Sequence, residues 1–400
     1  MALLSLAEAQ ARLLALAVPL PVERIPVHEA LGRYLAEPVT ARRTQPPADL
    51  SAMDGYALRA ADLPGPWRVI GESACGHPFA GQVGPSEAVR IATGALIPAG
   101  MDMVLMQEDA HRDGDALILT GTPPQPTGRH IRRTGFDFRQ GATLLAAGER
   151  LTPARIALVL SGGYGHVAVR RMPQVLVIDS GDELSADPGA CADHQIPASN
   201  GAMLAAQIAA ALPAKVERLG PVRDSLEALG DALDGAGQFD VIVTSGGASV
   251  GDHDLIRPAL AAWGAELDFW KVALKPGKPI MLARKGTQLV LGLPGNPVSS
   301  SVTAFLFLLP LLRALSGAAS PLPQAITTEA TEDLPAGGTR QEFLRAAWDG
   351  RRITAWLNQD SGALGALAAA NALIERPIDA PPVTAGEPVS AYLLENGGIA

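Results

Sequence analysis

Cysteine is almost absent from this chain of 400 residues, which contains only Cys75 and Cys191. Two thiols in different parts of a sequence can form neither a disulfide framework nor a cysteine-rich zinc cluster. Such a low count favours buried or incidental thiols in a reducing compartment, and we therefore expect a cytoplasmic protein.

Basic residues are too few for a broad nucleic-acid or membrane-binding surface. The sequence has 32 lysines and arginines against 41 aspartates and glutamates, so its formal net charge is −9. A surface of this sign repels polyanions over most of its area. Any anionic ligand must therefore be held by a local site.

Long apolar runs are also missing. The longest, residues 302–315, is too short for a membrane span and contains Pro310 and Arg313, which predicts a buried helix. The apolar positions of residues 3–17 follow helical spacing without a preceding positive segment, which favours an amphipathic helix over a signal peptide. Hydrophobic residues still make up 48% of the chain, which is enough for a compact protein of several domains.

The order of the sequence patterns predicts an α/β multidomain protein. Between residues 173 and 317, apolar strand-like runs alternate with helical segments. This alternation is typical of a mostly parallel sheet with helices on both faces, a three-layer α/β/α arrangement. Short alternating runs at residues 67–136, and again after residue 324, predict β-rich modules. A second N-terminal helix is expected at residues 27–39.

Glycines at the end of one predicted strand favour anion binding. In TSGGASVG (residues 244–251), adjacent glycines let the backbone turn its N–H groups into a concavity, and a helix is expected from about Asp254. A tight turn without a ligand is the alternative, because the Gly-Lys-Ser/Thr ending of a Walker sequence is missing. The candidate ligand-binding residues of this loop are Ser245, Gly246, Gly247, Ser249 and Gly251.

Two further segments add candidates for a phosphate site. KVALKPGKP (271–279) places Lys271, Lys275 and Lys278 on a short stretch limited by a Pro-Gly turn, and an extended segment would project the first two to one face. GLPGNPVSS (292–300) precedes an apolar helix whose free first-turn N–H groups suit a phosphate or carboxylate. Solvated lysines and an ordinary strand-to-helix turn are the alternatives. The candidates in the second segment are Pro294, Gly295, Asn296, Pro297 and Ser299.

Carboxylates follow the same predicted strand ends. The carboxyl ends of parallel strands meet at one edge of a sheet, where clustered acids repel one another unless a cation lies among them. Mg²⁺ prefers oxygen ligands and often bridges carboxylates and phosphates, so a phosphorylated ligand carried with its metal would use both features. Any single acid could instead cap a helix. The acids concerned are Asp182, Glu183, Asp224, Asp252 and Asp254.

Taken together, these motifs resemble those of the molybdopterin molybdenumtransferases, the family of MoeA and of the gephyrin E domain. SAMDGYA, KPGKP and GLPGNP, in this order, are highly specific. The resemblance covers almost the whole chain, in PP-x-x-x-SAMDGYA (46–57), IATGALIP (91–98), VLMQED (104–109), IRR-x-G-x-D (131–137), SGDEL (180–184), TSGGASVGDHD (244–254), FWKVALKPGKP (269–279), GLPGNPVSS (292–300) and RQEFLR (340–345).

The resemblance implies a reaction in which adenylated molybdopterin and molybdate give molybdenum cofactor and AMP, with Mg²⁺ as the divalent cation. Glu183, Asp224 and Asp254 would bind the metal. The same three acids and Asp54 would be catalytic, whereas Thr93, Asp137 and the three lysines would contact the substrate.

The resemblance also implies an elongated homodimer of four-domain chains, with each site formed between two protomers. Further partners would be the preceding adenylyltransferase and client molybdoenzymes. The expected domains are residues 1–40 together with 138–170 as a discontinuous N-terminal helical and linker domain, 41–137 as a β-rich domain carrying SAMDGY, 171–318 as the molybdopterin-binding α/β domain, and 323–400 as a C-terminal β-barrel-like domain.

Five residues depart from the family pattern. Phe136 stands where the family usually has Glu, and His130 and Leu50 replace Asn. Ala198 replaces Asp, and Asp179 replaces Ser or Thr. These changes leave a second function open, that of a paralog which binds or carries molybdopterin or the finished cofactor, with altered catalysis or none.

Overall fold

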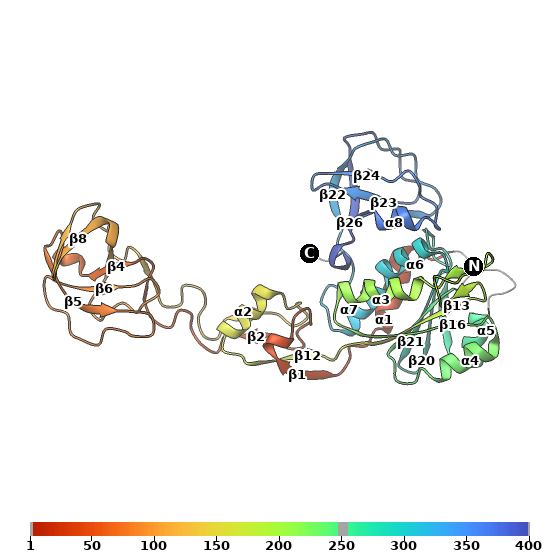
Figure 1. Ribbon diagram of the computed structural model, residues 1–400, viewed down its shortest axis with the longest axis horizontal. Helices are drawn as coiled ribbons and strands as arrows, with labels where there is room; N and C mark the ends of the chain where they lie inside the picture. Colours follow the sequence, from red (N-terminus) through yellow and green to blue (C-terminus); the bar gives the residue numbers. More distant parts are fainter. Residues whose placement is uncertain (1–2, 247–254, 399–400) are drawn as a thin grey trace.

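The computed structural model describes residues 3–246 and 255–398 and shows an elongated chain of separate modules (Figure 1). A β-rich module lies at one end of the long axis, and the α/β domain lies at the other end beside the C-terminal module. Two separate segments of the chain form a small module between them. Its elements are β1 (Val22–Pro26) paired with β12 (His166–Arg170), β2 (Val39–Thr40) paired with β11 (Thr143–Leu145), η1 (Val27–Glu29) and α2 (Pro153–Ser161).

The prediction of a helix at residues 27–39 is wrong. Only Val27–Glu29 forms a short 3₁₀ turn, and the chain then bends at Gly32, whose φ of +77° favours glycine. The helical spacing of the apolar residues has another cause, because Leu35 and Val39 are buried in the core of the small module without being helical.

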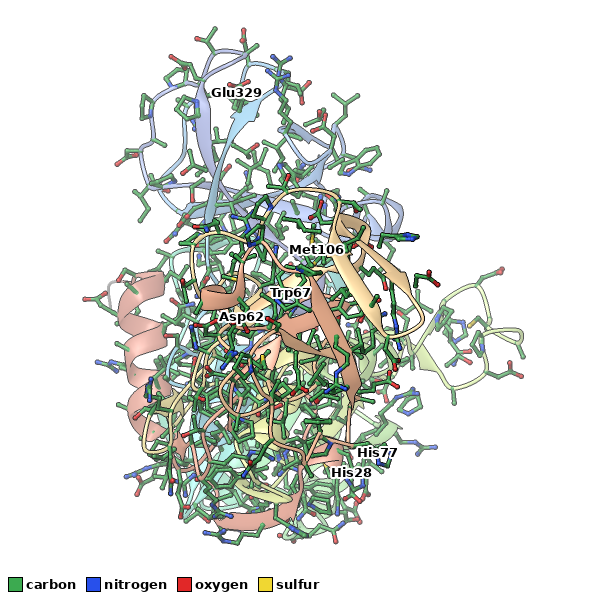
Figure 2. All side chains as sticks on the ribbon, turned by 90° about the vertical axis from the view of Figure 1, so that its left-hand side faces the viewer. His28, Asp62, Trp67, His77, Met106 and Glu329 are labelled. Atoms are coloured by element: carbon green, nitrogen blue, oxygen red, sulfur yellow. The ribbon has the colours of Figure 1, made fainter. Side chains whose placement is uncertain are left out.

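The β-rich module is a mixed sheet with strand order β7-β4-β6-β5-β9-β8, which confirms the predicted β structure. Trp67 and Val69, alternate residues of β5, are buried in its core. Seen along the long axis, this module lies in front of the rest of the molecule (Figure 2). Cys75 is exposed and Cys191 is half-buried, so neither is a buried thiol. The elements are β3 (Leu50–Ser51), β4 (Gly55–Leu58), η2 (Ala60–Asp62), β5 (Trp67–Ser73), β6 (Glu87–Ile91), β7 (Met103–Met106), η3 (Gln107–Asp109), β8 (Ala110–Asp113), β9 (Ala116–Leu119) and β10 (Ile131–Arg132).

The α/β domain is built on a sheet with strand order β16-β13-β17-β21-β20-β18. Neighbours from β16 to β21 are parallel, whereas β20 and β18 are added antiparallel, so the predicted mostly parallel sheet is confirmed. The carboxyl ends of β13, β17 and β21 therefore lie side by side. The elements are β13 (Gln174–Ser180), β14 (Leu184–Ser185), β15 (Ile196–Pro197), β16 (Lys215–Val222), β17 (Val241–Ser245), β18 (Glu266–Trp270), β20 (Met281–Lys285), β21 (Gln288–Leu293), α1 (Leu6–Leu16), α3 (Asn200–Ala211), α4 (Leu226–Asp234) and α5 (Ile256–Ala262).

Both faces of the central strands β13, β17 and β21 are buried, as their uninterrupted apolar runs predict. In β13, Val175 and Val177 belong to one core and Leu176 and Ile178 to another, because successive side chains of a strand point to opposite faces. Helices α1 and α3 cover the first face together with residues 297–315, and α4 and α5 cover the second (Figure 1).

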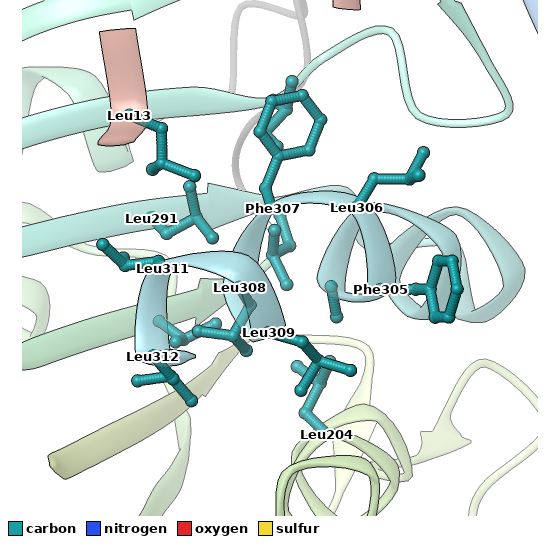
Figure 3. Close-up of a cluster of buried hydrophobic side chains, with 14 of the residues drawn as sticks. Leu13, Leu204, Leu291, Phe305, Leu306, Phe307, Leu308, Leu309, Leu311 and Leu312 are labelled. Carbon is teal, nitrogen blue, oxygen red and sulfur yellow. The ribbon is translucent and has the colours of Figure 1, made fainter. Parts of the chain in front are cut away.

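Residues 297–315 form one long buried helix, in agreement with the expectation from their apolar run. It consists of α6 (Pro297–Thr303), a π-helical stretch η4 (Ala304–Leu308) and α7 (Leu309–Leu315). Its length and composition would allow a membrane span, but 89% of its apolar window is buried inside the protein. Leu13, Leu204 and Leu291 from other elements belong to the same core (Figure 3). It is therefore a core helix of the α/β domain.

The C-terminal module is a closed sheet. Strand β25 pairs with both β26 and β23, so the order β23-β24-β22-β26-β25 returns to its first strand. Strand β19, which belongs to the KPGKP segment, pairs with β23 and thereby joins this barrel to the α/β domain. The elements are β19 (Leu274–Lys275), β22 (Ile326–Ala330), β23 (Gln341–Trp348), β24 (Arg352–Ala355), α8 (Leu364–Ala368), β25 (Ala372–Arg376), β26 (Pro388–Leu393) and η5 (Glu395–Gly397).

Candidate functional site

A cavity of about 350 Å³, here called the lysine cavity, lies where the KPGKP segment meets the C-terminal barrel. Three of its side chains, Lys275, Lys278 and Arg340, carry positive charge. The cavity is suited to an anion by this excess of basic groups. Its lining residues are Lys275, Pro276, Gly277, Lys278, Pro279, Ser299, Arg340, Glu342, Phe343, Leu344, Gln359, Asp360 and Ser361.

The shape of the lysine cavity depends on Gly277. Its φ is +106°, and a Cβ atom at this position would lie 2.3 Å from Cγ2 of Thr303, so the turn packs directly against the long helix. Lys275 is partly neutralised, because its Nζ lies 2.9 Å from Oε1 of Glu342 on the paired strand. Lys278 and Arg340 carry further positive charge and Asp360 carries negative charge, so the lining keeps a net positive charge.

Lys271 is not part of this cluster. Its φ of +72° interrupts the extended backbone on which a shared face with Lys275 was expected. Its ammonium group lies 3.7 Å from the centre of the Trp270 ring, a cation–π contact, and Lys271 does not line the lysine cavity. Arg340, which lies in the quoted RQEFLR motif, takes the third basic position instead. Arg340 was not among the predicted site residues, although it belongs to the RQEFLR motif.

A second cavity of about 470 Å³, the sheet-end pocket, lies at the carboxyl ends of β13, β17 and β21. Ligands of parallel α/β sheets bind at this edge. Six predicted site residues line it, namely Glu183, Ser245, Gly246, Gly295, Asn296 and Pro297. The other lining residues are Asp179, Ser180, Leu184, Ile196, Pro197, Ala198, Ser199, Asn200, Gly362 and Leu364.

Asn200, the first residue of α3, holds the strand ends of this pocket together. Its Nδ2 donates to Oγ of Ser245 at 2.9 Å and to the carbonyl oxygen of Gly295 at 2.6 Å. Gly246 allows the close approach of β17 to β13, since a Cβ there would lie 2.5 Å from the carbonyl oxygen of Ser180. Sequence reasoning did not select Asn200, because its role depends on contacts with residues 45 and 95 positions away.

Replacing Asn200 by alanine should lower the free energy of unfolding by about 1–3 kcal/mol, because Ser245 and Gly295 lose a shared donor. Urea unfolding followed by circular dichroism measures this change. Asn200→Asp keeps the size but replaces the donor with an acceptor, so it should be at least as destabilising. Equal stability of the alanine variant and the unmodified protein would contradict this bracing role.

Two of the departures from the family pattern, Asp179 and Ala198, line the sheet-end pocket. Asp179 is only 4% exposed, and its Oδ2 accepts the backbone N–H of Gly201 at 3.1 Å. Burial raises the pKa of the Asp179 carboxyl above its usual value, although the hydrogen bond from Gly201 opposes this shift.

The two cavities are neighbours. Asn296 lines the sheet-end pocket, and its Nδ2 donates to Oγ of Ser361, a lining residue of the lysine cavity, at 2.8 Å. Pro297 and Ser299, two residues apart in α6, line one cavity each. Pro294 lies just beyond β21, in the same loop. A single extended ligand could therefore enter both cavities.

The predicted acids are only partly brought together. Oδ1 of Asp182 accepts the backbone N–H of Asp224 at 3.3 Å, so the loops after β13 and β16 touch. Glu183 lines the sheet-end pocket, whereas Asp224 does not. Within residues 3–246 and 255–398, no group of three acidic, histidine or cysteine side chains is arranged to hold a metal ion. The predicted residues Gly247, Ser249, Gly251, Asp252 and Asp254 lie outside the described residues.

Asp54, Thr93 and Asp137 do not reach either cavity within one chain. Asp54 and Thr93 belong to the β-rich module, at the opposite end of the molecule from the α/β domain (Figure 1). Oδ1 of Asp54 accepts the backbone N–H of Thr93 at 2.6 Å, and this bond holds the pKa of the exposed carboxyl below its usual value. The backbone N–H of Asp137 donates to the carbonyl oxygen of Gln45 near the entry to the same module.

The other departures lie near this module. Leu50 belongs to β3, where it pairs with Arg132, and His130 adopts a φ of +64°. Phe136 is 75% exposed. Asp49, which sequence reasoning did not select, accepts the backbone N–H of Thr134, and this bond is the main reason why the pKa of Asp49 is lowered.

Comparison with protein families gives matches along most of the chain. Residues 4–163 match the model described as the MoeA N-terminal region (domain I and II). Residues 176–314 match the probable molybdopterin binding domain, and residues 327–394 match the MoeA C-terminal region (domain IV).

Similar proteins and structures agree with these matches. The chain is 35% identical over 348 residues to the molybdopterin molybdenumtransferase of Haemophilus influenzae. This alignment covers 86% of this chain and 85% of the relative. It is 34% identical over 395 residues to the molybdopterin molybdenumtransferase of Bacillus subtilis. This alignment covers 94% of this chain and 91% of the relative. The crystal structure of the molybdopterin biosynthesis MoeA protein from Pyrococcus horikoshii is similar with a TM-score of 0.83 at 28% identity, covering 98% of this chain and all of that one.

Proposed function

Because this chain belongs to the molybdopterin molybdenumtransferase (MoeA) family, and is thus a transferase of molybdenum cofactor biosynthesis, we propose that it inserts molybdenum into adenylated molybdopterin and releases AMP. The observation that carries this reaction is the pair of adjoining cavities, one basic and one containing Glu183. Adenylated molybdopterin joins a neutral pterin ring to phosphates, and these two parts fit this division. Cytoplasmic location, the preceding adenylyltransferase and client molybdoenzymes belong to the same proposal.

The lysine cavity would hold the phosphates of the substrate. Lys278 and Arg340 can offset the negative charge that grows on the phosphoryl oxygens while the bond to AMP breaks. Glu183, at the adjoining pocket, is placed to orient a water molecule or the molybdate. Polar groups that line the sheet-end pocket would position the substrate, namely those of Ser245, Gly246 and Asn296.

A second copy of the chain would complete each site. Asp54 and Thr93 lie in the β-rich module, far from the cavities of their own chain (Figure 1). The family resemblance predicts that they belong to the site, and a homodimer in which the β-rich module of one protomer covers the cavities of its partner would reconcile this prediction with their distance. The fixed, ionised Asp54 carboxylate would then face the substrate from the partner side.

The cation requirement is part of the proposal, but the described residues do not make a complete metal site. Asp182, Asp224 and Glu183 supply carboxylates near the strand ends, yet they do not form a three-ligand group. Oxygen ligands of this kind fit Mg²⁺ when the phosphates of a ligand complete the shell. We therefore expect Asp182, Asp224 and Glu183 to bind Mg²⁺ weakly until substrate is present.

Release of AMP from adenylated molybdopterin tests the function. With molybdate and millimolar Mg²⁺, AMP measured by chromatography should appear in step with molybdenum cofactor, and chelation of the cation should stop it. Mg²⁺ added alone should raise the melting temperature by less than about 1 °C, because few ligands bind the free ion. Tight binding of the substrate without AMP release would favour the carrier function, to which the exposed Phe136 and the loss of Asp at Ala198 would then contribute.

A further inference from the structure

The walls of the two cavities differ in chemistry. Lys275, Lys278 and Arg340 line the lysine cavity. Among the described residues that line the sheet-end pocket there is no lysine or arginine, and the ionisable groups are Asp179 and Glu183. The phosphates of a ligand that enters both cavities therefore belong in the lysine cavity, and its uncharged part belongs in the sheet-end pocket.

Asp179 lines this pocket, and one of its carboxylate oxygens has no hydrogen-bond partner among the described residues. Its Oδ2 accepts the N–H of Gly201, and a Cβ at Gly201 would lie 2.2 Å from this oxygen, so glycine permits the approach. Oδ1 is buried and has no hydrogen-bond partner in the part of the chain that the structure describes, and the same is true of Oγ of Ser180. Leaving such a group unpaired is destabilising, and a donor on a bound ligand would remove this cost.

A purely structural role explains only one of the two carboxylate oxygens of Asp179. One oxygen is enough to accept the N–H of Gly201 at the start of α3, and an amide or hydroxyl group would do the same at a lower desolvation cost. Burial raises the pKa of the Asp179 carboxyl, and the hydrogen bond from Gly201 and the charge of Arg218 oppose this shift. A ligand with N–H groups would supply a donor to the oxygen that lacks one.

We propose that Asp179 determines the specificity of the sheet-end pocket by accepting hydrogen bonds from the 2-amino-4-oxopyrimidine edge of a pterin ring. This inference rests on the proposed function, since it concerns the ring of the same substrate. The edge carries the ring N3–H and the 2-amino group as adjacent donors, and Oδ1, the oxygen that Gly201 leaves unpaired, has two lone pairs with which to accept them. Leu184, Pro197 and Leu364 supply apolar contacts for the faces of the ring.

Adenine and lumazine match this arrangement less well. Adenine offers a donor next to an acceptor, so a carboxylate that accepts from the amino group opposes the neighbouring ring nitrogen. Lumazine has the shape of pterin but carries an oxo group in place of the 2-amino donor. The pair of pterin and lumazine therefore isolates the contact assigned to Asp179.

The test measures binding of free pterin and of lumazine by ligand fluorescence. The unmodified protein should bind pterin at least about tenfold more tightly than lumazine, because a site built for a donor rejects an analogue that lacks it. Asp179→Asn should lose at least about tenfold in pterin affinity and should no longer prefer pterin, since its amide presents N–H groups to the ligand or gives up the bond to Gly201.

The controls separate this result from a loss of structure and from failure of the proposed function. Asp179→Asn should keep the melting temperature and the affinity for inorganic phosphate, which belongs to the lysine cavity. The comparison of the two rings on the unmodified protein requires no variant, so it stands even if Asp179→Asn unfolds. Equal affinity for pterin and lumazine, or no measurable pterin binding, would overturn the inference. Pterin selectivity without AMP release would instead overturn the proposed reaction alone.

Discussion

A heterodimer of an Asp54→Ala chain and a Glu183→Ala chain should be active although each variant homodimer is inactive. In a site shared between protomers, one of the two sites of this heterodimer receives an intact Asp54 from one chain and an intact Glu183 from the other. The second site receives both substitutions. Heterodimers purified through two different affinity tags should therefore show about half of the AMP-release activity of the unmodified dimer.

A matched heterodimer makes the result decisive. When an unmodified chain is paired with a chain carrying both substitutions, a shared site always lacks either Asp54 or Glu183, so no activity is expected. If each site were formed within one chain, the outcomes would be exchanged, with no activity in the first heterodimer and about half in the second. That exchanged pattern would reject the proposed assembly. Asp54 and Glu183 are both exposed, so neither substitution should unfold its module, which melting temperatures verify.

The α/β domain could be predicted from its sequence because local patterns determine much of it. Strand β13 reads as continuously apolar since Val175 and Leu176 face different cores, and both cores are covered by helices. The glycine and acid motifs fall at strand ends, so the position of a pocket follows from the sheet being mostly parallel. The antiparallel strands β18 and β20 were not anticipated, because pairing direction depends on the path of the whole chain.

The composition of the lysine cavity could not be predicted in the same way. Spacing alone grouped Lys271 with Lys275, but a positive φ and the Trp270 ring take Lys271 elsewhere. Pairing of β19 with β23 brings Glu342 to Lys275 and Arg340 to the cavity, and such a contact spans 67 residues of sequence. The separation of Asp54 from the cavities is likewise a property of module arrangement rather than of any motif.

Among substitutions that add a single methyl group near the lysine cavity, Gly277→Ala should lower the stability of the protein most. The new Cβ would lie 2.3 Å from Cγ2 of Thr303, on a buried helix that cannot move aside, and the φ of +106° is unfavourable for alanine. We expect a loss of about 2–5 kcal/mol in unfolding free energy, from overpacking and backbone strain together. Phosphate affinity should fall as well, because the same turn carries Lys278.

Gly350 provides the control for backbone strain. Its φ is +100°, close to that of Gly277, but a Cβ there would meet no atom within 4 Å, so Gly350→Ala should report the strain without the clash. Thr303→Ser removes the clashing methyl group and keeps the hydroxyl that donates to the carbonyl oxygen of Ser299. Added to Gly277→Ala, it should restore the steric part of the loss and leave a deficit like that of Gly350→Ala. A double variant no more stable than Gly277→Ala would show that contact with Thr303 does not set the position of the KPGKP turn.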